Sequence, residues 1–341
     1  MMVLNSDSFS QDLFQWFDGI KRDLPWRKAG GHANPYHVWL SEIMLQQTTV
    51  KSVIPYFLNF IQRWPTIEDL GRANLDEVLH AWQGLGYYTR AKNLHKCAQM
   101  IVGEFGGRFP EDRNALLKLP GIGPYTSAAI TSIAFEKPAI ALDGNVMRVI
   151  SRYLTLESLR PQLDQDAEAF LWQVIPQSRF GDFTQALMEL GALMCRPKSP
   201  MCLHCPLMKN CKAYLNAVPE DFPKKVLKKA LPQKFGHAFL LKNSNHQILI
   251  RKRAGKGILS GLYEVPTTDW DLTLPKRLLQ DISLPEHLNL RGEVNHTFTH
   301  FHLNLKVWEG ATRHLNQGEW VDFENLKDYA LPTLMKKVLS L

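Results

Sequence analysis

The stretch from Lys118 to Asp143, KLPGIGPYTSAAITSIAFEKPAIALD, limits the possible folds of this chain more than any other stretch. Its opening LPGIGP predicts a tight turn between two helical segments. Gly121 and Gly123 have no Cβ, so the backbone can take positive φ there and approach another molecule closely. Pro124 suits the first turn of the next helix, where a missing N–H costs nothing. The free amides of such a turn form a nest that fits a phosphate group.

A second feature of this stretch is its last residue, Asp143, which directly precedes the helical pattern GNVMRVISR. An aspartate there predicts an N-cap, and the helix dipole favours its ionised form. A phosphate clamp and a persistent carboxylate are therefore expected on one short scaffold. Taken singly, a Gly-x-Gly turn and a capping aspartate are more often only a turn and a cap.

Another carboxylate lies in the segment YHVWLSEIMLQQT, residues 36–48, which predicts a helix. Glu42 has the apolar neighbours Val38, Trp39 and Ile43 on that helix. Burial disfavours a charged carboxylate, so the pKa of Glu42 is expected to rise towards neutrality, where it suits a proton donor. Most helical glutamates are simply solvated, so the position alone does not decide its role.

Two aromatic segments are candidates for contacts with nucleobases. Trp26 and Arg27, in the loop DLPWR, could stack on and orient a base. In AWQGLGYYTR, two glycines and two tyrosines predict a turn that presents Leu85 and Tyr87 to a base stack. The alternatives are a surface Trp-Arg pair at the first position and buried aromatic packing at the second.

Four of the five cysteines are crowded into the pattern C-x6-C-x2-C-x5-C, formed by Cys195, Cys202, Cys205 and Cys211. Four thiolates so close in sequence would repel one another without a metal, and they are not spread like a disulfide framework. An all-cysteine site suits either Zn²⁺ or a [4Fe–4S] cluster. A reducing cytoplasmic compartment fits this cysteine usage.

Length, charge and periodicity indicate two domains with a polyanionic partner. The chain has 341 residues, a formal net charge of +7 and a pI of about 9.1. Residues 217–234 hold three prolines and a surplus of lysine, which predicts a basic linker. Residues 1–216 predict a helical region, whereas alternating apolar residues within 235–341 predict an α+β domain. No secretory or membrane-spanning segment is recognised.

Together and in this chain order, WLSEIMLQQT, GLGYYTRAKNLHK, LPGIGPY, LDGNV and the cysteine pattern resemble the adenine DNA glycosylase (MutY) family. This family belongs to the helix-hairpin-helix/endonuclease III superfamily, and the resemblance covers essentially the whole chain. It implies a mainly α glycosylase region with a [4Fe–4S] loop and a Nudix-like α+β C-terminal domain. It also implies a cytoplasmic monomer that excises adenine opposite 8-oxoguanine or guanine in double-stranded DNA.

The resemblance further assigns the chemistry. Glu42 would protonate adenine, and Asp143 would stabilise the positive charge that develops on the sugar. Related bifunctional glycosylases carry a nucleophilic lysine where this chain has Tyr125, and Lys118 is not at the matching position. Without that amine no obligatory Schiff base forms, so a monofunctional glycosylase is expected.

Contacts with DNA follow from the same resemblance. Gln47 and Thr48 would enter the duplex, Tyr87 would wedge beside the damaged pair, and Gln185 would contact the adenine edge. Phe298, Thr299 and His300 match a Phe-Ser-His loop that probes the oxidised guanine, with Thr in place of Ser. The expected DNA- and base-binding set is Trp26, Arg27, Gln47, Thr48, Leu85, Tyr87, Gly121, Gly123, Gln185, Phe298, Thr299 and His300.

Three other functions are kept as alternatives. A DNA-binding redox or sensor module would bind DNA and release no base. A bifunctional endonuclease of the thymine-glycol type is disfavoured by Tyr125 and by the appended β-domain. A Nudix hydrolase is disfavoured because the acidic Nudix signature is missing after Gly261.

Overall fold

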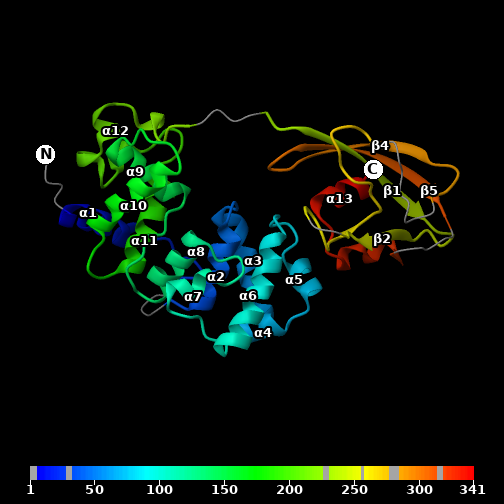
Figure 1. Cartoon of the computed structure of the whole chain (residues 1–341), viewed down its shortest axis with the longest axis horizontal. Helices are drawn as coiled ribbons and strands as arrows, with labels where there is room; N and C mark the ends of the chain where they lie inside the picture. The colour runs from blue at the N-terminus through cyan, green and yellow to red at the C-terminus, as the bar shows by residue number, and fades with distance from the viewer. Residues whose placement is uncertain (1–5, 28–32, 226–229, 255–256, 276–283, 313–317) are drawn as a thin grey trace. The chain divides into compact units, whose positions relative to one another are not determined.

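A computed structural model of the chain describes residues 6–27, 33–225, 230–254, 257–275, 284–312 and 318–341 (Figure 1). It forms two compact units. The first contains Met1–Arg72 and Asn93–Leu227, and the second contains Ala73–Lys92 and Lys228–Leu341. The sequence predicts that all of residues 1–216 belong to one helical region. The structure instead groups Ala73–Lys92 with the C-terminal residues. The middle of the predicted linker, residues 226–229, lies outside the described residues.

The first unit is helical. Its main helices are α1 (Ser6–Ile20), α2 (Pro35–Leu45), α3 (Val50–Arg63), α4 (Ile67–Arg72), α7 (Arg113–Leu117), α8 (Pro124–Ala129), α9 (Gly144–Leu154), α10 (Gln162–Val174), α11 (Phe180–Glu189) and α12 (Lys212–Leu215). Helix α6 (Thr89–Phe105) begins in the second unit and continues into the first. Phe9, Leu13 and Phe17 lie on one face of α1 at helical spacing and are buried against α9, α10 and α11 in the core of this unit.

Helix α2 starts with a cap and ends earlier than the sequence predicts. The side chain of Asn34 accepts a hydrogen bond from the Tyr36 amide, and Pro35 occupies the first helical position. The helix ends at Leu45, and Gln47 has a positive φ of 58°. The predicted extension of the helix to Thr48 is therefore three residues too long.

The predicted hairpin turn joins α7 to α8. Gly121 has φ +80°, and an added Cβ there would lie 3.0 Å from the Cβ of Asn93, so glycine is needed for both reasons. Gly123 has φ −98° and is not left-handed, so positive φ is confirmed only at Gly121. Helix α8 continues as a π-helical turn, η1 (Ile130–Ala134), before the chain reaches Asp143 at the start of α9.

The second unit is built on a six-stranded mixed sheet (Figure 1). Its strands are β1 (Gln233–Lys242), β2 (Ile248–Lys252), β3 (Tyr263–Glu264), β4 (Asn289–Thr297), β5 (His302–Ala311) and β6 (Glu319–Val321). The order is β3-β2-β1-β5-β4, with β6 paired to β2 and with β1 and β5 parallel. Leu334, Met335 and Val338 of α13 (Thr333–Leu339) pack against this sheet. The predicted α+β class is confirmed, and β1 and β2 pair as an antiparallel hairpin.

Helix α5 (Leu75–Ala81) and the turn after it belong to the same unit as the sheet. A ring nitrogen of His80 lies 2.9 Å from the carbonyl oxygen of Lys327. The side-chain amide of Gln83 donates a 2.6 Å hydrogen bond to the carbonyl of Leu331. These contacts fix the backbone that carries Tyr87.

Candidate functional site

A cleft of about 1280 Å³ in the first unit gathers most of the residues predicted to act on the base. Its walls come from the loop before α2, from α2 itself, from α8, from the start of α9 and from α11. The predicted site residues that line it are Trp26, Arg27, Glu42, Gln47, Thr48, Tyr125, Asp143 and Gln185. The fold thus brings both predicted carboxylates to one cavity large enough for a purine.

Glu42 is the buried acid of this cleft. It is 6% exposed, and the Tyr125 hydroxyl donates a 2.6 Å hydrogen bond to its Oε2. Burial raises the pKa of Glu42 to about 7, and the nearby negative charge of Asp143 adds to that rise. The Tyr125 bond and the positive charge of Arg27 lower the pKa but do not cancel the effect of burial. Glu42 can therefore hold or release a proton near neutral pH.

Asp143 caps α9 as the sequence predicts. One carboxylate oxygen accepts a 2.7 Å hydrogen bond from the Val146 amide, and the other accepts a 2.9 Å bond from the Asn145 side chain. Burial nevertheless raises the pKa of Asp143 above its ordinary value, although both hydrogen bonds and the charge of Arg148 lower it. The ionised form predicted from the helix dipole is therefore opposed by burial, which no local pattern indicates.

Tyr125 comes from the first turn of α8 and faces the acid. Burial raises the pKa of its phenol well above the ordinary value, and the negative charge of Glu42 raises it further, so the hydroxyl stays protonated. It is a hydrogen-bond donor to Glu42 and also lies 3.9 Å from the sulfur of Met188. Tyr125 is thus the direct hydrogen-bond partner of Glu42, and it has no amine that could attack a sugar.

A buried ion cluster in the cleft was missed by the sequence analysis. The side chain of Glu189, on α11, is 0% exposed and accepts hydrogen bonds from Arg22 Nε at 2.7 and 3.0 Å and from Arg27 Nη1 at 2.6 Å. Trp26 is also buried, with its ring edge-on to Phe57. The available signal was a glutamate inside the apolar run ALMEL, which is the same signal that identified Glu42.

The other predicted contact residues of this cleft lie at its rim and wall. Gln47 is exposed, and the Thr48 hydroxyl donates to the carbonyl of Gln46 at 3.4 Å. The side-chain amide of Gln185 donates to the carbonyl of Gly181, one turn earlier on α11, at 3.1 Å. The nitrogen of Gln185 is therefore held by its own helix, while the residue as a whole lines the cleft.

The hairpin glycines lie outside the residues that line the cleft. Gly121 is exposed, and Gly123 is at the N-cap of α8 with open space where a Cβ would stand. The backbone at Gly123 is therefore open to the approach of another group. The local geometry is compatible with the predicted phosphate contact.

A second pocket, of about 390 Å³, lies in the second unit. Tyr87, Phe298, Thr299 and His300 line it, and the hydroxyls of Tyr87 and Thr299 share a 2.7 Å hydrogen bond. Two segments predicted to contact DNA, more than 200 residues apart, are thus brought together. Tyr87 is 46% exposed, whereas Leu85 is only 6% exposed and packs inside the unit.

The four clustered cysteines are free thiols in residues 195–211, which follow the π-helical turn Leu190–Met194 that continues α11. Burial raises the pKa of Cys205 to about 12, and negative charges at Cys195, Cys211 and Cys202 raise it further. Arg152, which is 2% exposed, donates to Cys195 Sγ at 3.4 Å and to two loop carbonyls. Within the described residues, no three Cys, His, Asp or Glu side chains are placed to hold a single metal ion.

Among the residues that the structure describes, none of the helices is long and apolar enough to cross a membrane.

Comparison with known proteins gives two family matches. Residues 40–177 match the model of the HhH-GPD superfamily of base excision DNA repair proteins, and residues 237–341 match the NUDIX domain model. The chain is 36% identical to the adenine DNA glycosylase of Buchnera aphidicola subsp. Schizaphis graminum, with 98% of each chain covered. It is 34% identical to the adenine DNA glycosylase of Homo sapiens, with 98% of this chain and 74% of the human protein covered.

Solved structures resemble the helical part of the chain. A thermostable thymine-DNA glycosylase aligns with a TM-score of 0.55 and 31% identity, covering 62% of this chain and 97% of that one. A trapped endonuclease III–DNA covalent intermediate aligns with a TM-score of 0.53 and 26% identity, covering 63% and 99%.

Proposed function

The chain belongs to the adenine DNA glycosylase family of base excision repair, and we propose that it removes adenine paired with 8-oxoguanine or guanine in double-stranded DNA. The observation that carries this proposal is the pair Glu42 and Asp143, a buried acid with a pKa of about 7 and a capping carboxylate in one cleft. Two carboxyl groups in different environments are what the cleavage of a glycosidic bond requires.

The first step is extrusion of the adenine from the base stack, which costs a few kcal/mol. The cleft offers the base an apolar wall from Leu142 and Met188 and a polar wall from Gln185. Protonated Glu42 then donates its proton to N7 of the adenine, because a neutral purine is a much better leaving group than an anionic one.

The second step is departure of the base and capture of the sugar by water. As the C1′–N9 bond breaks, positive charge develops on the sugar, and ionised Asp143 stabilises it from close range. The hydrogen bonds from Val146 and Asn145 favour the ionised form of Asp143 for this step. Glu42, deprotonated by the first step, accepts a proton from the attacking water.

Tyr125 and the Glu189 cluster act on Glu42 in this proposal. The phenol of Tyr125 orients the carboxyl group through its 2.6 Å bond, and its lack of an amine leaves hydrolysis as the route. Glu189 fixes Arg27, whose charge lowers the pKa of Glu42. The positive charge of Arg27 thereby limits the rise that burial causes and keeps the pKa of Glu42 at about 7.

DNA contacts complete the proposal. The amides at Gly121 and Gly123 bind a phosphate, and Gln47 and Thr48 contact the duplex beside the extruded base. In the second unit, exposed Tyr87 wedges into the stack, while Phe298, Thr299 and His300 read the base opposite adenine. Leu85, being buried, supports this turn from behind.

We also propose that Cys195, Cys202, Cys205 and Cys211 hold a [4Fe–4S] cluster. The donor set fits, because four cysteines in one short stretch supply the thiolate ligands of such a cluster, and Cys205 lies near enough to Cys195, Cys202 and Cys211 for their negative charges to raise its pKa. The buried Arg152 offsets the negative charge of ligating thiolates through its bond to Cys195. When bound, the cluster supplies a covalent anchor for the loop and a one-electron redox centre. The loop also carries four exposed basic residues, which in this proposal contact DNA phosphates: Arg196, Lys198, Lys209 and Lys212.

A single-turnover assay on duplexes with adenine opposite 8-oxoguanine, G, C or T tests the function. We expect release of adenine opposite 8-oxoguanine and G, with strand cleavage only after alkali. Glu42→Gln and Asp143→Asn should each abolish release, and near-wild-type rates in either variant would refute the assigned roles. Binding without release would favour the sensor module, and a covalent complex trapped by borohydride would favour the bifunctional endonuclease.

A further inference from the structure

The loop predicted to read the base opposite adenine is closed by its own backbone and supported by aromatic rings. The amide of Phe298 donates a 2.9 Å hydrogen bond to the carbonyl of Phe301, which makes a tight turn. The ring of Phe298 stacks on Trp270, with centroids 5.6 Å apart and planes 27° apart. His296 meets the same ring edge-on at 4.6 Å, and Phe301 lies at 4.9 Å. Three rings therefore hold Phe298, and of these Trp270 alone comes from a distant segment of the chain and stacks on its face.

Trp270 comes from a different segment, which is fastened along strand β1. Asp271, the residue after Trp270, exchanges two backbone hydrogen bonds with Phe235, of 2.7 and 3.1 Å. A Cβ added at Gly236 would lie 2.8 Å from Cδ1 of Trp270. Glycine at position 236 thus provides the space that the indole occupies.

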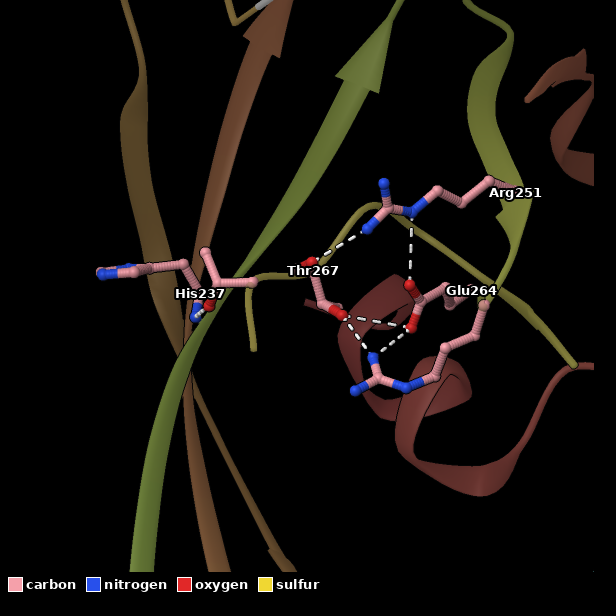
Figure 2. Close-up of polar contacts among 6 residues, drawn as sticks. His237, Arg251, Glu264 and Thr267 are labelled. Carbon is pink, nitrogen blue, oxygen red and sulfur yellow. Dashed lines mark hydrogen bonds and ion pairs between the residues drawn. The ribbon is translucent and has the colours of Figure 1, made fainter. Parts of the chain in front are cut away.

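The other support of Trp270 is a buried charge cluster. The guanidinium carbon of Arg253 lies 4.2 Å from the indole centroid, which is cation–π distance. Arg253 Nη1 donates to Glu264 Oε2 and to Thr267 Oγ1, both at 2.7 Å. Glu264 is 2% exposed and accepts a 3.3 Å bond from Arg251 Nε. Figure 2 draws these polar contacts as dashed lines. Its bonds to Glu264 and Thr267 hold Arg253 over the ring.

We propose that Trp270 is a positioning residue for recognition of the base opposite adenine, holding Phe298 in the orientation from which the loop distinguishes 8-oxoguanine from guanine. This inference rests on the proposed function of the loop Phe298–His300. The chain of support runs from Glu264 through Arg253 to Trp270 and then to Phe298. Loss of the indole frees Phe298 without removing any group that touches DNA.

A purely structural role for Trp270 makes a different prediction. Trp270 also contacts Phe301, at a centroid distance of 6.2 Å, so its removal will weaken the packing of this face of the sheet. General weakening would reduce binding to both duplexes alike, whereas loss of positioning reduces the preference for 8-oxoguanine. The ratio of two dissociation constants separates the two effects.

The test uses the full chain and two duplexes that carry a tetrahydrofuran site, which cannot react, opposite 8-oxoguanine or opposite G. For Trp270→Leu we expect the preference for the 8-oxoguanine duplex to fall about three- to tenfold, the range of one aromatic pair. Trp270→Phe, which keeps a ring against Phe298, should stay within about twofold of wild type, a difference smaller than the loss of one aromatic pair. Trp320→Leu is the matched control, because Trp320 packs with Phe239, Leu241 and Leu249 in a separate cluster.

Gly236→Ala provides an independent variant that displaces the indole and keeps it in the chain. A loss of preference in Gly236→Ala supports the proposal even if Trp270→Leu does not fold. An unchanged preference in Trp270→Leu, or an equal loss in Trp320→Leu, would overturn it while leaving the glycosylase function intact. A wild-type chain that releases no adenine would overturn the proposed function first and this inference with it.

Discussion

Replacing Glu42 by Gln separates catalysis from stability at one position. The glutamine keeps the size of the side chain and an oxygen that can accept the Tyr125 hydrogen bond, but it carries no acidic proton. General acid catalysis contributes roughly 10²–10⁴ to a rate, so we expect single-turnover adenine release to fall at least about 100-fold. In the wild-type protein, release should decline as pH rises through about 7, because only protonated Glu42 can donate.

The same substitution should stabilise the protein at alkaline pH. The pKa of Glu42 is about 7 in the folded state against the ordinary 4.5, a difference of about 2.5 units or about 3 kcal/mol. Between those two pH values the unfolded chain has lost the proton that the folded chain keeps. Wild-type stability therefore falls as pH rises from 4.5 to about 7, and the loss is complete above that pH. Glu42→Gln escapes this loss.

The assay is urea unfolding of wild type and variant between about pH 5 and about pH 9, a range that spans the titration of the folded acid. Glu104→Gln is the control, because Glu104 is exposed. Burying the amide that Glu42→Gln introduces adds a cost that does not change with pH, so the diagnostic quantity is the change in the stability difference. We expect the variant to gain about 3 kcal/mol relative to wild type from the acidic to the alkaline end. A difference that stays constant with pH would refute a raised pKa for Glu42.

Other predictions test the remaining parts of the site. Tyr125→Phe removes the hydrogen bond that lowers the pKa of Glu42, so the alkaline decline of adenine release should move to higher pH in a rate–pH profile. Gly121→Ala places a Cβ at φ +80° and should destabilise the fold by about 1 kcal/mol or more in urea titrations. Cys205→Ser should lower the iron content and the visible charge-transfer absorption of protein purified without oxygen, and a zinc-containing colourless wild type would contradict the cluster.

Much of the site could be predicted because its signals are local. Asp143 caps α9 by accepting a hydrogen bond from an amide three residues away. An aspartate directly before a helical pattern already indicates such a cap. The turn at Gly121 needs φ +80°, which glycine tolerates. The end of a helix was predicted less accurately. Helix α2 ends at Leu45 and not at Thr48, because the backbone at Gln47 takes a positive φ that a helix does not allow.

The sequence by itself determined the helix that carries Glu42, the cap at Asp143 and the cysteine spacing, because each depends on residues only a few positions apart. Tertiary structure alone decided that Tyr125 donates to Glu42 across 83 positions, and that Glu189 binds Arg27 across 162. It also decided that the pKa of Asp143 rises, since burial comes from packing and outweighs a local hydrogen bond. No periodicity encodes such contacts, because each depends on where separate elements meet.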